Sequence, residues 1–161
     1  AKNRAPGLDR SFAAQRWKNM DSKLWLEAGD EAMDKEFHGH YDIWGGDIDP
    51  AAVELAKHNA ELAGVENCIR FEVADAGKFH RDSEYGQLVT NPPYGERLLE
   101  KKEAEELYRV FGAALRDLPP KWRVLVLSSH TEFERCFGRT ADKKRKLYNG
   151  MIKCDVFMYG R

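Results

Sequence analysis

A short segment, Asn91-Pro92-Pro93-Tyr94, carries the residues with the clearest chemical meaning in this 161-residue sequence. The lone pair of an exocyclic amine on a nucleobase is delocalised into the ring, so the nitrogen is a poor nucleophile. Two neutral acceptors around its two N–H bonds favour a tetrahedral nitrogen and free that lone pair. The Asn91 amide oxygen and the Pro92 carbonyl supply two such acceptors. The two prolines restrict φ and hold the carbonyl in place.

The ring of Tyr94 offers a face on which an unstacked base can lie, and such stacking contributes about 1–3 kcal/mol per base. A methyl donor must lie in line with the amine nitrogen, so much of the catalysis would be positioning. The segment therefore predicts methylation of a base amine, with Asn91, Pro92, Pro93 and Tyr94 as catalytic residues. The alternative is that the tetrapeptide is only a loop after a strand.

Two acidic residues are candidates for binding an adenosine-containing cofactor. Asp47 follows a predicted strand and precedes a helix. A carboxylate there can accept from both ribose hydroxyls, and Ile48 would pack against the adenine. Asp75 would accept from the adenine amino group, with the Ala76 N–H meeting the ring and Asn91 bordering the same cofactor site. The alternatives are local: Asp47 as a cap of the next helix, and Asp75 as part of an Asp-x-Gly turn.

Strands and helices must alternate to position these residues. Hydrophobic periodicity and cap signals predict helices over residues 22–37, 50–62, 101–115 and 133–136. Strands are expected over 41–46, which breaks at its glycines, and over 69–73, 88–90 and 123–128, followed by a hairpin over 143–159 that turns at Asn149-Gly150. This order predicts an α/β fold with an open, mostly parallel sheet and a C-terminal antiparallel hairpin. Ligands bind such sheets beyond the carboxyl ends of the strands, where Asp47, Asp75 and Asn91 fall.

The charge balance restricts how the chain meets a nucleic acid. Lys plus Arg number 26 and Asp plus Glu 27, a formal net charge of −1. A free-standing nucleic-acid module is usually more basic, so contacts must come from local patches or from another domain. Lys143-Lys144-Arg145-Lys146 is one such patch. Its alternative reading is the solvated, charged edge of a terminal strand.

The cysteines and histidines predict no metal site. Cys68, Cys136 and Cys154 lack metal-ligand spacing, and their odd count does not suit a secreted disulfide framework. His38 and His40 have no neighbouring carboxylate or cysteine that would complete a metal site. We expect a reduced, cytoplasmic protein without a membrane segment, because neither a signal peptide nor a bilayer-length apolar run is present.

The chain resembles the bacterial 23S ribosomal-RNA guanine-N2 methyltransferase family, whose members are often labelled N6-adenine-specific DNA methylases. The resemblance covers essentially the whole chain and is carried by Gly46-Asp47-Ile48-Asp49-Pro50, Asn59, Ala63-Gly64-Val65, residues 91–98 (Asn-Pro-Pro-Tyr-Gly-Glu-Arg-Leu) and Leu147-Tyr148-Asn149-Gly150. It implies a Rossmann-like class I methyltransferase fold, S-adenosylmethionine as cofactor, and ribosomal RNA as partner with guanine N2 as target. By this resemblance Asp47 is the ribose-binding acid, Asp75 the adenine-binding acid, and residues 91–94 the catalytic segment.

One departure from the family concerns its Gly-rich cofactor loop. Family members carry a further strand, a loop of the Asp-Pro-x-x-Gly-Ser-Gly-Thr type and an RNA-binding THUMP domain before the region matched here. The resemblance therefore implies that residues 1–161 are a partial methyltransferase catalytic domain, with the first strand missing between strands 41–46 and 88–90. We expect a gap, a rearranged pairing or a partner chain there. We also expect this chain alone to bind cofactor poorly and not to turn over.

Two other functions use the same features. An adenine-N6 DNA methyltransferase is the first, because the Asn91 segment suits either amine; a paired target would require base flipping in both cases. A non-catalytic nucleic-acid interaction module is the second. An NAD-dependent dehydrogenase is disfavoured, since no Gly-x-Gly-x-x-Gly follows a strand.

Overall fold

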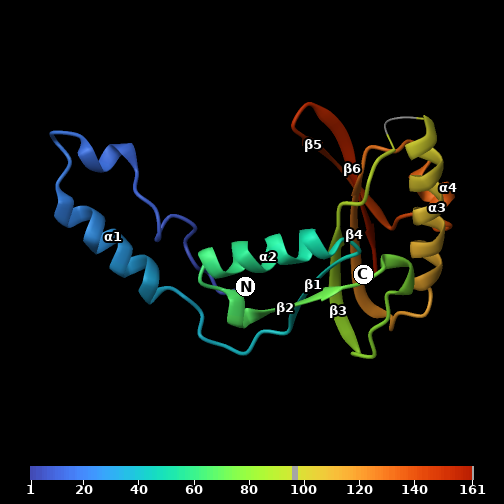
Figure 1. Cartoon of the computed structure of the whole chain (residues 1–161), viewed down its shortest axis with the longest axis horizontal. Helices are drawn as coiled ribbons and strands as arrows, with labels where there is room; N and C mark the ends of the chain where they lie inside the picture. The colour runs from blue at the N-terminus through green and yellow to red at the C-terminus, as the bar shows by residue number, and fades with distance from the viewer. Residues whose placement is uncertain (96–97, 161) are drawn as a thin grey trace. The chain divides into compact units, whose positions relative to one another are not determined.

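The computed structural model describes residues 1–95 and 98–160, and the chain divides into two compact units, Ala1–Val73 and Ala74–Arg161. Each unit has its own sheet (Figure 1). The first sheet pairs β1 (Ile43–Asp47) with β2 (Ile69–Val73) in parallel. The second has the order β3-β4-β6-β5, with bounds Tyr85–Thr90 for β3, Lys121–Ser128 for β4, Lys143–Asn149 for β5 and Ile152–Tyr159 for β6. The predicted α/β class is confirmed.

In the first unit, α2 (Pro50–Leu62) packs on β1 and β2 through the buried Val53 and Ala60. Its N-cap is Asp49, whose carboxylate accepts from the Ala51 N–H at 2.9 Å. The remaining elements of this unit are α1 (Ser22–Asp34) and the 3₁₀ turns η1 (Ala13–Arg16) and η2 (Glu66–Cys68). The helix predicted to reach residue 37 thus ends at Asp34.

The prediction that the first strand breaks at its glycines was wrong. β1 continues through Gly45 and Gly46 to Asp47, paired with β2 along its whole length. The reason lies across the sheet. A Cβ on Gly45 would stand 3.0 Å from ring atoms of Phe71, its partner residue on β2. The missing side chain therefore makes room for the phenylalanine ring within a continuous strand.

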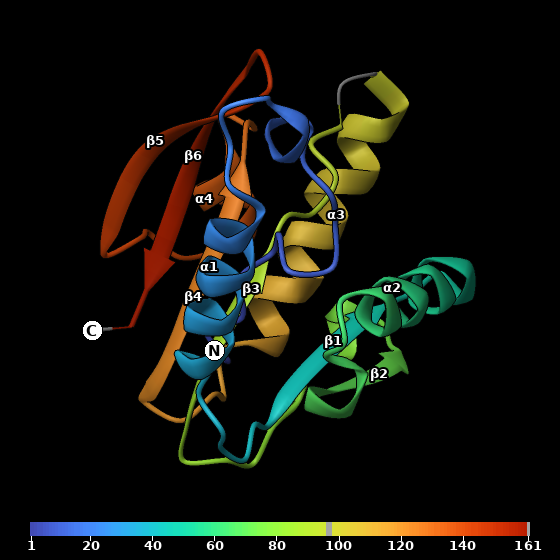
Figure 2. The same cartoon turned by 90° about the vertical axis from the view of Figure 1, so that its left-hand side faces the viewer.

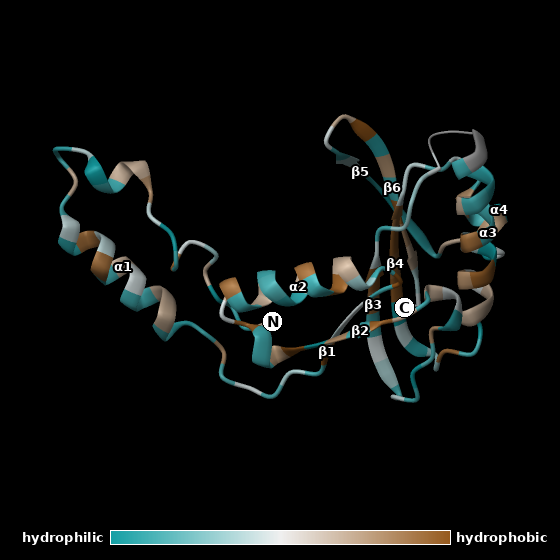
Figure 3. Cartoon of the chain, viewed as in Figure 1, coloured by the Kyte–Doolittle hydropathy of each residue, from teal (hydrophilic) through white to brown (hydrophobic). Residues whose placement is uncertain are grey.

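In the second unit, α3 (Leu98–Ala114) and α4 (Phe133–Phe137) contribute with the strands to one aromatic core, and η3 (Ala76–Lys78) contacts α3. Figure 3 shows hydrophobic stretches along β4 and β6. The Phe133 ring lies 4.9 Å from the Tyr108 ring and 4.5 Å from the Phe157 ring, centroid to centroid. The core residues are Ala104, Tyr108, Phe111, Leu115, Val124, Val126, Phe133, Cys136, Phe137, Phe157 and Tyr159.

The closing hairpin turns one residue later than expected. β3 and β4 are parallel, whereas β6 is antiparallel to both β4 and β5, and Figure 2 shows β5 and β6 as a twisted hairpin. Asn149 pairs with Ile152, so the two-residue loop is Gly150-Met151 and not Asn149-Gly150. Gly150, with φ +61°, takes the left-handed conformation at the first loop position. Asn149 stays in β5, where its side chain has a partner described below.

The strands β1 and β3, between which a missing strand was expected, each have a single strand neighbour among the described residues. Among the described residues, β1 pairs only with β2 and β3 only with β4, so neither pairs with the other. Tyr85 and Val89 on β3 are largely exposed, as is Val73 on β2. No helix within residues 1–95 and 98–160 is long and apolar enough to cross a bilayer.

Candidate active site

β3 delivers the segment that sequence analysis singled out. Thr90, its last residue, pairs with Val126 of the buried strand β4, and Asn91 follows at the carboxyl end. Pro92 and Pro93 cannot donate to a ladder, so the strand stops and the chain turns away. We call residues 91–94 the acceptor segment. Residues 96 and 97, which belong to the longer motif, lie outside the described residues.

The Tyr94 hydroxyl is the centre of a small polar network. It donates to the Asn91 Oδ1 at 2.6 Å and accepts from the Asn149 Nδ2 at 3.2 Å. The Cys154 thiol also donates to it, at 3.6 Å. Burial raises the pKa of Tyr94, and the hydrogen bond from Asn149 opposes this rise. The phenol is therefore a neutral donor at neutral pH, and it binds the oxygen that the chemistry requires as an acceptor.

Tyr108 holds the other end of the acceptor segment from inside the core. Its side chain is fully buried on α3, and its hydroxyl donates to the Pro93 carbonyl at 2.5 Å. The Ser128 hydroxyl lies 3.4 Å from the Tyr108 hydroxyl oxygen. Burial raises the pKa of Tyr108, with the Ser128 contact opposing it, so this phenol is also neutral.

The two proline carbonyls are thus distinguished by their partners. Pro93 is engaged by Tyr108, whereas no group among residues 1–95 and 98–160 donates to the Pro92 carbonyl. The catalytic role of the Pro92 carbonyl stays a prediction, which requires this oxygen as an acceptor. Fixing the Pro93 carbonyl also restricts the peptide that joins the two prolines, because φ is already restricted at both.

A buried histidine packs against Tyr108. The His130 ring lies edge-on to the Tyr108 ring, with centroids 5.6 Å apart. Its Nδ1 accepts from the Glu132 N–H at 3.1 Å, so Nε2 carries the proton. That Nε2 stands 3.4 Å from a Glu105 carboxylate oxygen without the angle of a hydrogen bond. His130 therefore contributes a ring contact to the packing around Tyr108.

A pocket of about 360 Å³ separates the acceptor segment from α3. Asn91 does not line it, and two of the lining side chains are acidic, so it is poorly suited to a phosphate. The lining residues are Pro93, Tyr94, Gly95, Glu100, Glu103, Ala104 and Leu107.

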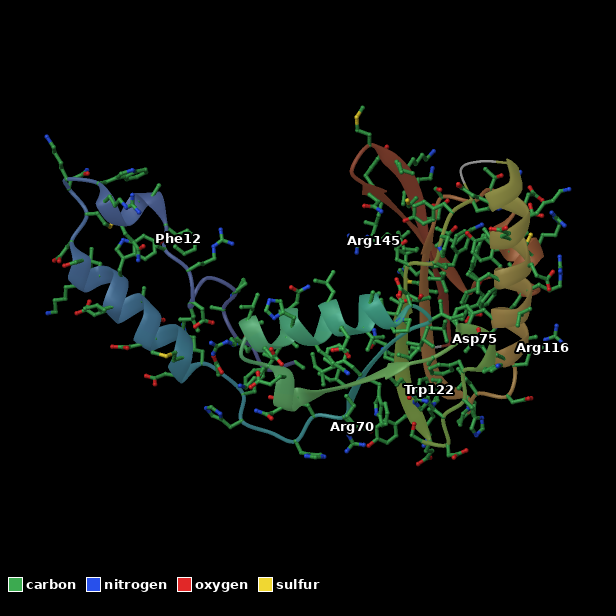
Figure 4. The ribbon with its side chains drawn as sticks, in the orientation of Figure 1. Phe12, Arg70, Asp75, Arg116, Trp122 and Arg145 are labelled. Atoms are coloured by element: carbon green, nitrogen blue, oxygen red, sulfur yellow. The ribbon has the colours of Figure 1, made fainter. Side chains whose placement is uncertain are left out.

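The residues expected to bind cofactor are divided between the two units. In the first, the Asp47 Oδ1 accepts from the Asp49 N–H at 2.9 Å, and the Ile48 side chain is exposed. In the second, the Asp75 Oδ1 accepts from the Gly77 N–H at 2.8 Å, just before η3 begins at Ala76 (Figure 4). The Asp-x-Gly turn that was the alternative for Asp75 is therefore present, whereas the cap of α2 is Asp49 and not Asp47. Each carboxylate keeps a second oxygen, and the cofactor roles stay predictions, as does convergence with Asn91.

The three cysteines form no disulfide among the described residues. Cys68, Cys136 and Cys154 are free thiols, and burial raises the pKa of Cys136. No group of three or more His, Cys, Asp or Glu side chains within the described residues is arranged to hold a metal ion.

Sequence reasoning missed three residues of this site. Tyr108 lies within the helix predicted from hydrophobic periodicity over residues 101–115, and Asn149 was predicted to lie in a turn. A signal for Tyr108 existed, since a buried tyrosine hydroxyl usually needs a hydrogen-bond partner. Cys154 carried no such signal, because its proximity to Tyr94 depends on the pairing of β6 with β4 and β5.

Comparison with known proteins yields a family match over nearly the whole chain. The family model described as the RMKL-like methyltransferase domain matches residues 1–157. The chain is 42% identical to "Putative RNA methyltransferase YpsC" of Bacillus subtilis, with 98% of this chain and 41% of that protein covered. It is 39% identical to the ribosomal RNA large subunit methyltransferase K/L of Shewanella baltica, with 96% of this chain and 23% of that protein covered.

A solved structure extends the match to the fold. "SMU.472, a putative methyltransferase complexed with SAH" aligns with a TM-score of 0.93 at 39% identity, covering 99% of this chain and 43% of that chain. The chain therefore spans well under half the length of these relatives.

Proposed function

Because the chain belongs to the RMKL-like methyltransferase domain family, we propose that it supplies the amine-binding part of an S-adenosylmethionine-dependent methyltransferase acting on a nucleic-acid base. We propose guanine N2 in 23S ribosomal RNA as the target, and the name of one relative, a ribosomal RNA large subunit methyltransferase, supports the RNA part of this proposal. The observation that carries the proposal is the acceptor segment. Its Asn91 oxygen and its Pro92 carbonyl, to which no group in residues 1–95 and 98–160 donates, follow a parallel strand end, where such folds bind ligands.

The acceptor segment would bind the target amine through two oxygens. The Asn91 oxygen and the Pro92 carbonyl would each accept one N–H of the target amine, which localises the nitrogen lone pair. The Tyr94 phenol, now bonded to Asn91, would release that oxygen when the amine arrives. Bound S-adenosylmethionine would supply an electrophilic methyl group. The residues suited to hold it are Asp47 and Asp75, each with a carboxylate oxygen beyond its turn contact.

The chain would act as part of a larger catalytic domain. Two facts support this: it spans 41% of one relative, and β1 and β3 each have one strand neighbour among the described residues. We therefore expect the isolated 161-residue chain to bind S-adenosylmethionine weakly and to transfer no methyl group.

Asn91→Ala in the whole protein tests the proposed function. Removing one amine acceptor should lower the single-turnover rate by about a hundredfold, at the lower end of what a positioned acid–base group contributes. The affinity for S-adenosylmethionine, measured by calorimetry, should stay within twofold. Asn67→Ala is the matched control, because the Asn67 side chain is exposed and, within the described part of the chain, bonds to its neighbour Glu66 alone.

The substrates in this experiment should be 23S ribosomal RNA and duplex DNA, with products identified by nucleoside mass spectrometry. Detection of N2-methylguanosine in RNA would support the proposal. Detection of N6-methyladenine in DNA would instead identify DNA adenine as the substrate. Unchanged transfer by the Asn91→Ala protein would overturn the role of the acceptor segment.

A further inference from the structure

The strand β5 concentrates positive charge at the edge of the second sheet. Its sequence contains Lys143, Lys144, Arg145 and Lys146 in succession, and every residue of β5 is exposed. The chain as a whole has a net charge of −1, so this is a local concentration. Sequence alone left open whether these charges bind a ligand or merely solubilise an edge.

The register of the hairpin separates the four charges onto two faces. Residues directly opposite each other in an antiparallel pair point to the same side of the sheet. The face that we call the Asn149 face carries, along β5, Lys143, Arg145, Leu147 and Asn149. The other, which we call the Phe157 face, carries Lys144, Lys146 and Tyr148, with Phe157, Asp155 and Lys153 opposite them on β6.

One charge on the Phe157 face has a charged partner within the protein. The Lys144 Nζ lies 2.7 Å from a Glu134 carboxylate oxygen and 5.8 Å from the centre of the Phe157 ring. Lys144 therefore serves the packing of β5 against α4. Lys146 forms no ion pair within 4 Å among the described residues, but it is directly opposite the acidic Asp155 in the ladder, whereas Lys143 and Arg145 are opposite Met158 and Val156.

The charges on the Asn149 face have no such partners. Among the described residues, no carboxylate oxygen lies within 4 Å of the side-chain nitrogens of Lys143 or Arg145. In Figure 4, Arg145 extends from the hairpin on the side of the sheet opposite α3 and α4. Between Arg145 and Asn149 stands Leu147, which is 39% exposed. This face thus presents two uncompensated cations and one accessible apolar side chain.

The same face leads directly to the acceptor segment. Asn149 donates to the Tyr94 hydroxyl, which in turn bonds to Asn91. At about 3.4 Å per residue, Arg145 and Lys143 stand about 14 Å and about 20 Å from Asn149 along β5. The cations therefore form a row that ends beside the residues expected to hold the target base.

We propose that the Asn149 face of β5 is the track for a single-stranded stretch of nucleic acid next to the methylated nucleotide, with Arg145 and Lys143 binding its phosphates. This inference rests on the proposed function and adds to it the path of the substrate. Charge complementarity selects the occupant, because a polyanion fits uncompensated cations beside an apolar side chain. A single strand suits a base that must be unstacked to reach Tyr94.

Two double variants of the whole protein test the track, with equal changes in net charge. Lys143→Gln with Arg145→Gln removes the cations of the Asn149 face, and Lys146→Gln with Lys153→Gln removes two from the Phe157 face. Binding of a fluorescein-labelled 12-nucleotide RNA is measured by anisotropy across a salt series. The first pair should weaken binding by on the order of tenfold and lower the salt slope by about 1.4, since each phosphate contact contributes about 0.7. The second pair should change affinity by less than twofold.

The outcomes separate the track from the proposed function. Equal losses of RNA affinity in both double variants would indicate a general charge effect and overturn the track. No loss of affinity in either variant would also overturn the track, and would leave a protein partner as the occupant of the Asn149 face. Loss in the first pair alone supports the track, even if methyl transfer to RNA fails. A single-stranded DNA of the same sequence, run in parallel, reports which nucleic acid the track prefers.

Discussion

At the scale of single residues, the acceptor segment is held by side chains from distant parts of the chain. Asn91, Pro92 and Tyr94 lie within four consecutive residues, so the amine site is a hypothesis that their types alone can suggest. Tyr108 is 15 residues from Pro93, and its contact depends on how α3 packs against the sheet. Sequence patterns report that a helical face is apolar, but not which hydroxyl on that face meets which carbonyl.

Tyr108→Phe should separate positioning from packing at this site. The ring stays in the core, while the Pro93 carbonyl loses its donor. A net hydrogen bond contributes about 0.5–1.5 kcal/mol, so kcat should fall by roughly two- to tenfold while the affinity for S-adenosylmethionine holds. Single-turnover kinetics of the whole protein measure this. Tyr85→Phe, at a position largely exposed on β3, is the control. An unchanged kcat would remove Tyr108 from the positioning machinery.

At the scale of elements, strands and helices were predicted better than their ends. Gly45 and Asn149 show why. Each residue type usually interrupts a strand, yet each lies within one, because a partner on another strand or loop fills the space or bonds the side chain. The parallel pairs β1–β2 and β3–β4 and the closing hairpin followed from the order of elements, whereas the division into two sheets did not. The contacts of Gly45 and Asn149 depend on tertiary structure that local propensity does not contain.

Gly112 in α3 marks the closest packing between two helices. A Cβ there would stand 2.0 Å from the Phe137 carbonyl oxygen, which is backbone and cannot move aside cheaply. Gly112→Ala should therefore destabilise the fold by about 1–3 kcal/mol, despite the better helix propensity of alanine. Gly29→Ala in α1, with nothing within 4 Å, should stabilise by up to about 1 kcal/mol. Urea denaturation measures both, and equal effects would contradict the packing argument.

At the scale of the whole molecule, burial is unequal between the two units. Only Val53 and Ala60 are buried among the described residues of the first unit, whereas the aromatic core belongs to the second. Burial of apolar surface is the dominant stabilising contribution. The division into units was not predictable from composition, because the sequence around the boundary at Val73-Ala74 is not linker-like.

This inequality predicts stepwise unfolding. Amides of α2, β1 and β2 should exchange with solvent at lower denaturant concentration than amides of β4 and β6, because local stability follows buried apolar contacts. Hydrogen exchange with peptide-resolved mass spectrometry, at rising urea below the main transition, measures the difference. Identical protection in both units at every concentration would mean that they unfold as one cooperative body.

The hydrogen bond between Tyr94 and Asn91 has a consequence for inhibitor design. The Asn91 amide oxygen, which under the proposed function a base-mimicking compound would engage, already accepts a hydrogen bond from the phenol at 2.6 Å. A single N–H donor that displaces this bond only exchanges one hydrogen bond for another, which leaves little net gain in affinity. A bifunctional scaffold that offers a donor to Asn91 and an acceptor to the displaced phenol satisfies both groups. Medicinal chemistry against this family is therefore better served by paired donor–acceptor motifs than by simple amines.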